Sequence, residues 1–184
     1  MNFLNKIIIF TLFMGCHSFV YGQSENFPSK DTIDFSKYKL EDATGKIVRI
    51  SDFKGKVVFL DFWFTGCAGC IMFYEQTLHR LKMKYHDQVV FITISIDKDK
   101  EKWQRSVASG MYTDSLAVNL YTREQGGKHE LIRDLGVEVY PSLFILDRNQ
   151  YFVSKNENKE LRKLEGNKAE QRLLQALLPS EERD

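Results

Sequence analysis

The stretch DFWFTGCAGC, residues 61–70, decides both the fold and the chemistry of this chain. An apolar segment carrying one carboxylate, Asp61, leads through Gly66 to two cysteines, Cys67 and Cys70. Two cysteines at this spacing, at the start of a helix, can close a small disulfide and reopen it. A thiolate there is stabilised by the helix dipole and by free backbone N–H groups. The stretch therefore predicts thiol–disulfide exchange, with the first cysteine as an activated nucleophile.

Length and charge set the outer limits of what the chain can be. Its 184 residues allow one sizeable domain with room for a leader, and a hydrophobic content of 43% is enough for a core. The formal net charge of +1 gives no case for binding nucleic acid or an anionic membrane surface. We therefore expect a globular domain whose partners are not polyanions.

Residues 1–22 are typical of an export signal. Lys6 lies in a short, mildly basic segment, and residues 7–14 form a mostly apolar stretch. Cleavage after Gly22 would release a soluble protein, whereas the resemblance to a lipobox around Cys16 would leave a lipid-anchored one. An uncleaved membrane anchor is the third alternative. All three place the following domain outside the cytoplasm, in the periplasm or cell envelope.

The cysteine count narrows the role of the CxxC pair. Removal of residues 1–22 leaves Cys67 and Cys70 as the only cysteines of the chain. An exported protein with a single CxxC pair does not use disulfides as a structural framework, and a ring of four residues stabilises a fold very little. The pair is therefore a redox centre or part of a metal site.

Behind the leader we expect a flexible entry segment at residues 23–32 and one domain at residues 33–180. Buried-strand patterns recur along the domain, at 56–64, 89–96, 118–121 and 142–146. Helical patterns alternate with them, at 70–85, 100–109, 128–135 and 167–178. Two antiparallel additions are also expected, a hairpin within residues 38–50 and a strand at 151–154. In the last helix, the buried stripe is expected at Leu173, Leu174, Leu177 and Leu178.

This order of elements indicates an α/β fold with helices on both faces of a central sheet. The chain resembles the exported, TlpA/ResA-like type of thioredoxin-fold protein, over residues 33–178. GKVVFLDFW, residues 55–63, resembles the family's GKvvlvdFW strand, and CAGC, residues 67–70, falls at its redox pair. GVEVYPSLFILD, residues 136–147, resembles the family segment that carries a cis proline. The resemblance implies a thioredoxin-like fold, a central mixed sheet with an N-terminal β-hairpin extension.

The active-site motif departs from the family in two positions. The family's usual WCxPC is GCAGC here, so both the tryptophan and the proline between the cysteines are missing. The dipeptide between the cysteines tunes the balance of thiolate and disulfide, so the family's redox potential does not carry over. Gly69 also makes a looser helix start than proline would.

The resemblance implies a role for each residue of the redox centre. Cys67 would be the attacking thiolate, and Cys70, one turn into the helix and more buried, would resolve the mixed disulfide. Asp61 matches the family's buried strand carboxylate, and burial would raise its pKa so that it can exchange a proton with Cys70. The alternative for Asp61 is a structural carboxylate at a strand end.

The resemblance also implies a substrate-binding site made of Tyr140, Pro141, Trp63 and Gly66. A cis Pro141 would place the backbone of Tyr140 beside Cys67, where it can pair with an extended peptide. An ordinary trans proline at a strand start is the alternative, and core packing is the alternative for Trp63.

Together these features predict an exported, monomeric thiol–disulfide oxidoreductase without a cofactor, a reductase of disulfides in other periplasmic proteins. The family resemblance implies a membrane thiol carrier as the electron donor, and contact with the membrane itself only if Cys16 is lipidated. The alternative is a copper- or zinc-binding metal carrier that uses the CxxC pair, with His129 as a third ligand.

Overall fold

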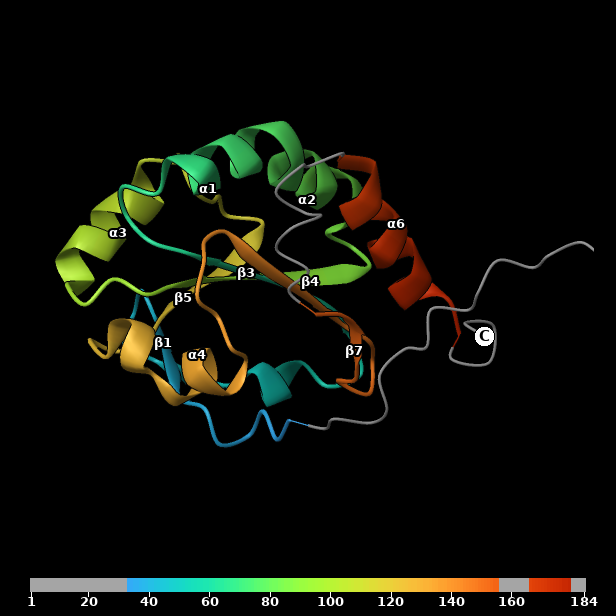
Figure 1. Ribbon diagram of the computed structural model, residues 1–184, viewed down its shortest axis with the longest axis horizontal. Coiled ribbons are helices and arrows are strands. Elements are labelled where there is room, and N and C mark those ends of the chain that lie inside the picture. The colour runs from blue at the N-terminus through green and yellow to red at the C-terminus, as the bar shows by residue number, and fades with distance from the viewer. Residues whose placement is uncertain (1–32, 156–165, 180–184) are drawn as a thin grey trace, which may run out of the picture.

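The structure of this protein, a computed structural model, describes residues 33–155 and 166–179 (Figure 1). The predicted signal peptide at 1–22 and the entry segment at 23–32 lie outside these residues. The part of the chain that is described contains the whole of the predicted thioredoxin-like domain except residues 156–165 and 180.

Within the described residues, seven strands form one mixed sheet in the order β2-β1-β5-β4-β3-β6-β7 (Figure 1). The strands are β1 Leu40–Asp42, β2 Ile47–Val48, β3 Val57–Trp63, β4 Val89–Ser95, β5 Ala117–Tyr121, β6 Ser142–Leu146 and β7 Phe152–Ser154. β3, β4 and β5 are parallel neighbours, and every other pairing is antiparallel. The predicted N-terminal hairpin is confirmed as β1 and β2, which extend the sheet beyond β5.

The strand before the cysteines, β3, is buried along its whole length. Successive side chains of a strand point to opposite faces, so Val58, Leu60 and Phe62 enter one half of the core while Val57 and Phe59 enter the other. A run that is apolar except for Asp61 suits such a strand, because both faces of the sheet are covered.

The helices follow the predicted order. They are η1 Ile50–Phe53, α1 Ala68–Phe73, η2 Tyr74–Leu78, α2 His79–Tyr85, α3 Lys100–Ala108, η3 Gly126–Lys128, α4 Glu130–Asp134 and α6 Gly166–Leu177. α1, η2 and α2 run on as one helix, in which η2 is a π-helical turn. This helix and α6 lie on one face of the sheet and α4 lies on the other (Figure 1). No helix in the described ranges is both long enough and apolar enough to cross a bilayer.

The predicted buried stripe of α6 is wrong in part. Leu173 is buried as expected, but Leu174 and Leu178 are 47% and 42% exposed. Ala169 and Ala176 occupy the buried positions instead. These alanines lie four residues before and three residues after Leu173, on the same helical face, whereas Leu174 is turned away by one residue's rotation.

Candidate active site

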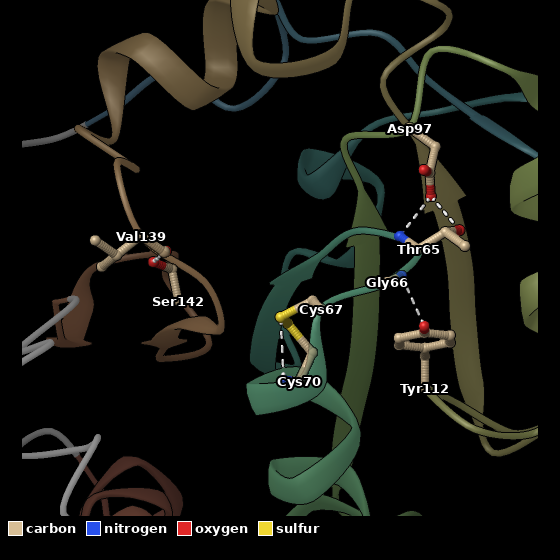
Figure 2. Close-up of a disulfide and its surroundings, with 8 residues drawn as sticks. All are labelled: Thr65, Gly66, Cys67, Cys70, Asp97, Tyr112, Val139 and Ser142. Atoms are coloured by element: carbon tan, nitrogen blue, oxygen red, sulfur yellow. Dashed lines mark hydrogen bonds between the residues drawn. A yellow bond between two sulfur atoms is a disulfide. The ribbon is translucent and has the colours of Figure 1, made fainter.

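Cys67 and Cys70 are joined in a disulfide, with an S–S distance of 2.04 Å, at the start of α1 (Figure 2). Cys67 is the N-cap residue of α1, and its Sγ accepts the backbone N–H of Cys70 at 3.1 Å. Both residues are nearly covered, with exposed fractions of 6% for Cys67 and 3% for Cys70. In the disulfide form, Cys67 is therefore the more exposed of the two cysteines only by a narrow margin.

The turn that precedes Cys67 is held from two sides (Figure 2). The carboxylate of Asp97 accepts the backbone N–H of Thr65 at 3.1 Å and its hydroxyl at 2.8 Å. The backbone N–H of Gly66 donates to the hydroxyl of Tyr112 at 2.8 Å. Gly66 has φ of +99°, a conformation that residues with a Cβ rarely adopt. These contacts fix the direction in which the chain enters α1. Sequence reasoning missed Asp97 and Tyr112.

An aromatic cluster packs against the disulfide. Trp63 stacks on Tyr112 with ring centroids 4.5 Å apart, and Trp103 stacks on Tyr121 at 4.7 Å. Both tryptophans are fully buried in the hydrophobic cluster that contains the two cysteines. Trp63 thus lies in the same cluster as the two cysteines and contributes packing in this form of the protein.

Asp61 lies on the same face of β3 as Val57 and Phe59, the face covered by α1 and α2. Its side chain is 3% exposed, and its Oδ1 has no hydrogen-bond partner among the described residues. Burial raises the pKa of Asp61 from 3.8 to about 7, although the nearby positive charge of Lys82 opposes this rise. A carboxyl group with such a pKa can take up and release a proton near neutral pH.

Lys82 is a buried charged residue close to Asp61 that the sequence analysis did not find. It is fully buried on α2, and its Nζ lies 3.1 Å from Oδ1 of Asp114 and 3.4 Å from Oγ1 of Thr113. Burial lowers the pKa of Lys82, and the carboxylate of Asp114 opposes that effect. The signal available in the sequence was its spacing: Lys82 lies four residues after Leu78, on the buried side of the helix.

The loop before β6 approaches the CxxC motif from the opposite side. The Tyr140–Pro141 peptide bond is cis. A β-carbon at Gly69 would lie 3.6 Å from Cδ of Pro141 and 3.8 Å from the carbonyl oxygen of Tyr140. The ring of Tyr140 packs edge-on against Phe64, with centroids 5.4 Å apart. The next turn is closed by the Ser142 hydroxyl, which donates to the carbonyl oxygen of Val139 (Figure 2).

The structure places most of the expected residues close together. Cys67, Cys70 and Trp63 lie in one buried cluster against which Tyr140 packs, and Pro141 approaches Gly69 between the two cysteines. Asp61 lies on β3, the strand that leads to the motif, and its charged neighbour is Lys82.

His129, the third ligand of the alternative metal site, has other partners. Its Nδ1 accepts the backbone N–H of Leu131 at 3.2 Å, which caps α4, and its Nε2 lies 3.1 Å from the carbonyl oxygen of Lys39. Burial lowers the pKa of this histidine. Across the described part of the chain, no group of three or more His, Cys, Asp or Glu residues could hold a metal ion.

Comparison with known proteins adds a family and several relatives. A family described as thioredoxin-like matches residues 55–152. The thiol-disulfide oxidoreductase ResA of Bacillus thuringiensis is 29% identical over 153 residues, covering 79% of this chain and 82% of the relative. Among solved structures, a candidate thiol:disulfide interchange protein DsbE from Chlorobium tepidum has a TM-score of 0.62 at 23% identity, covering 77% of this chain and 93% of that one. The thioredoxin domain of a Bacteroides vulgatus thiol-disulfide oxidoreductase has a TM-score of 0.58 at 21% identity, covering 76% and 98%. At these identities the two structures support the fold.

Proposed function

The chain belongs to the thioredoxin-like family and is a thiol–disulfide oxidoreductase, and we propose that it is an exported reductase of disulfides in other proteins. In this proposal Cys67 is the nucleophile, Cys70 the resolving thiol and Asp61 the acid–base group. The observation that carries the proposal is the capping geometry of the first cysteine. Sγ of Cys67 accepts an N–H of the first turn of α1, the position at which a helix favours a thiolate over a thiol.

The reaction consists of two exchange steps. The Cys67 thiolate attacks one sulfur of a substrate disulfide, and the other substrate sulfur leaves as a thiolate and takes up a proton. Cys70 then gives its proton to Asp61 and attacks Sγ of Cys67, which releases the second substrate sulfur. The substrate gains two electrons and the Cys67–Cys70 pair loses two, giving the disulfide that the structure contains.

Asp61 is suited to the second step because of its burial. Its pKa of about 7 allows it to be ionised, and thus basic, at the pH at which Cys70 must lose a proton. A fully solvated aspartate would be far too weak a base for a thiol of ordinary pKa.

The substrate is proposed to bind along the loop at Tyr140 and Pro141. This loop approaches the CxxC motif at Gly69, which has no side chain to fill the space between them. An extended peptide can pair with backbone groups of such a loop while its disulfide reaches Cys67. Gly66, on the other side of Cys67, leaves that approach equally open, with nothing within 4 Å of a β-carbon placed there.

Continued turnover requires a dithiol donor that reduces the Cys67–Cys70 disulfide again. We propose a membrane thiol carrier for this role, and an extracytoplasmic location for the domain, which acts as a monomer. The location is supported by the export-type residues 1–22 and by a mature chain whose cysteines would be the CxxC pair alone.

The proposal is tested by expressing the Cys70→Ser variant in an exporting bacterial cell. Without the resolving thiol, protein substrates stay attached to Cys67 as mixed disulfides, which separate on reducing gels. The matched control is the variant with both cysteines replaced by serine, which captures nothing. If Cys70→Ser yields no reducible adducts, the protein does not exchange disulfides with protein substrates.

A second measurement settles the direction of electron flow. The reduction potential of the Cys67–Cys70 pair is determined by equilibration with glutathione buffers. A reductase requires a potential well below that of the oxidised compartment in which it acts, in the range of reducing thioredoxins near about −270 mV. A potential near about −120 mV, that of a strong oxidant, would contradict the reductive role.

A further inference from the structure

A buried polar cluster lies beside Asp61 and continues to the protein surface. Asp61 on β3 is paired in the sheet with Thr93 on β4. The hydroxyl of Thr93 donates to Oδ1 of Asn119 at 2.8 Å and lies 3.3 Å from Oγ1 of Thr113. Thr113 is also a hydrogen-bond partner of the Lys82 ammonium. The polar groups around Asp61 therefore come from two neighbouring strands, from α2 and from the segment before β5.

Asp114 connects this cluster to solvent. Its Oδ1 pairs with Lys82, while its Oδ2 lies 3.1 Å from Nδ1 of His79 and accepts the hydroxyl of Tyr74 at 3.0 Å. Although burial alone would raise the pKa of Asp114, the contacts with His79 and Lys82 bring it below the ordinary value. Asp114 is therefore ionised near neutral pH and provides a counter-charge for the Lys82 ammonium.

We propose that Lys82 is a positioning residue of the exchange reaction: held by Asp114, it keeps a positive charge beside Asp61 and sets the pH range in which Asp61 can accept the proton of Cys70. This inference rests on the function proposed above. Lys82 touches neither sulfur and acts through Asp61. The ring of Tyr74 also holds the ammonium group of Lys82 in place: Nζ lies 4.9 Å from the ring centroid, and the face of the ring attracts a cation.

The cost of burying Lys82 indicates that its charge, and not its packing, is the property that matters here. A fully buried ammonium is costly to place in a protein, and the cost is reduced here by one carboxylate, one hydroxyl and one aromatic face. A methionine would fill the same space without that cost. The charge next to Asp61 is the property that methionine would not supply.

The charged and titratable groups around the pair can be named element by element. α2 contributes Lys82 and, at the surface, His79; the segment before β5 contributes Asp114; η2 contributes Tyr74. β4 and β6 place Thr93 and Leu143 opposite Asp61, and neither titrates. Lys82 is the group whose charge acts on Asp61, and it favours the carboxylate form.

The role of Lys82 is tested in the second exchange step, in which Cys70 must lose its proton. Reduced protein is mixed with excess dithiobis(nitrobenzoate) in a stopped-flow instrument. Cys67 releases one coloured thiolate as it forms a mixed disulfide, and Cys70 releases the second as it resolves that disulfide. The rate constant of the second phase is measured as a function of pH. Its midpoint reports the group that accepts the Cys70 proton.

In the Lys82→Gln variant, the midpoint of this profile is expected to move upward by about 1 pH unit, because Asp61 loses the neighbouring positive charge. At the parent's midpoint the second phase then slows several-fold, and at high pH the two proteins converge. Lys82→Met, which fills the same space without a polar group, should show the same shift even if glutamine disturbs folding.

Lys84→Gln is the matched control, since it removes the same charge two residues further along α2. Lys84 is 58% exposed and pairs with Glu170, so its loss should leave the midpoint unchanged. In an Asp61→Asn background, Lys82→Gln should have no further effect, because the group through which it acts is gone.

Three results would overturn the inference: an unchanged midpoint in both Lys82 variants, an equal shift in Lys84→Gln, or a Lys82 effect that persists without Asp61. Each of these leaves the proposed function standing if the parent shows two phases. A parent that releases no second thiolate would instead contradict the resolving role of Cys70.

Discussion

Gly69, which lies between the two cysteines of the CxxC motif, approaches Pro141 in the loop before β6. A β-carbon at Gly69 would come within 3.6 Å of Cδ of Pro141, an ordinary van der Waals contact. The two residues are separated by about seventy positions in the sequence, and they join the start of α1 to the loop before β6. The space between them accepts one methyl group.

Gly69→Ala should therefore raise the free energy of unfolding by about 0.5–1 kcal/mol. The new methyl group meets Pro141 without a clash, and alanine restricts the unfolded chain more than glycine does. Gly66→Ala is the contrasting variant, because φ at Gly66 is +99°, and it should cost roughly 1–2 kcal/mol. Urea unfolding of the oxidised proteins measures both. Changes of the same sign would show that the local backbone is not as described.

Tyr112→Phe should lower the free energy of unfolding by about 1 kcal/mol, because the N–H of Gly66 loses its acceptor. The ring still stacks on Trp63, so the change isolates the hydroxyl. The turn before Cys67 becomes less fixed, and the rate of attack by Cys67 on a small disulfide should fall several-fold. Tyr151→Phe, on an exposed side chain, is the control and should change neither quantity. Equal effects of the two substitutions would contradict an anchoring role for the Tyr112 hydroxyl.

Asp61→Asn should make stability less dependent on pH. The pKa of Asp61 is about 7 in the folded state and 3.8 in the unfolded state, so between these values the folded protein holds a proton that the unfolded chain has lost. The contribution of this group is greatest below about pH 4 and declines as the pH rises to about 7. The variant should therefore gain on the parent over that range, by up to about 4 kcal/mol. Urea unfolding at several pH values checks this, and a constant difference would exclude the raised pKa.

Glu170 on α6 binds α2 and should govern the stability of the protein in acid. Its carboxylate lies 2.8 Å from Nζ of Lys84, from a guanidinium nitrogen of Arg80 and from the hydroxyl of Tyr85. Hydrogen bonds from Lys84, Arg80 and Tyr85 lower the pKa of Glu170 from 4.5 to about 2. The stability that this carboxylate provides is present above its unfolded pKa and is lost as the pH falls towards about 2.

Glu170→Gln should therefore cost about 1 kcal/mol at neutral pH and progressively less as the pH falls towards about 2, where the parent begins to lose the same charge. Thermal unfolding across this range measures the difference. Glu101→Gln, on a side chain that is 85% exposed, serves as the control and should be neutral throughout. A deficit of Glu170→Gln that persists in acid would show that packing, and not charge, holds α6.

The sequence predicted the elements that are mostly apolar. β3 is apolar except for Asp61 and β4 is apolar except for Thr93 and Ser95, and covering both faces of a sheet requires such runs wherever the strands lie. The CxxC pair and the Tyr140–Pro141 segment were found because a short motif determines them locally.

Residues that act on the site from a distance could not be predicted. Tyr112 lies between Gly110 and the predicted strand at 118–121, where the sequence has no helical or strand periodicity, so its approach to Gly66 depends on the tertiary path of that loop. Lys82 lies in a helix rich in basic residues, and its charge alone suggests a solvated position. Its burial depends on partners that the fold places around it, above all Asp114 across from α2.

The π-helical turn at Tyr74–Leu78 has a consequence for comparing this chain with its relatives. The buried positions between Cys70 and Tyr85 span four turns in fifteen residues, and a straight α-helix of that length would be about 60° out of phase at its far end. The wider turn absorbs this difference, as an inserted residue does. In a variant with one residue deleted there, the helix could keep the CxxC motif in its present position or keep Lys82 buried against the sheet, but not both. Alignments should therefore place a one-residue gap between Cys70 and Lys82 in relatives whose helix is straight.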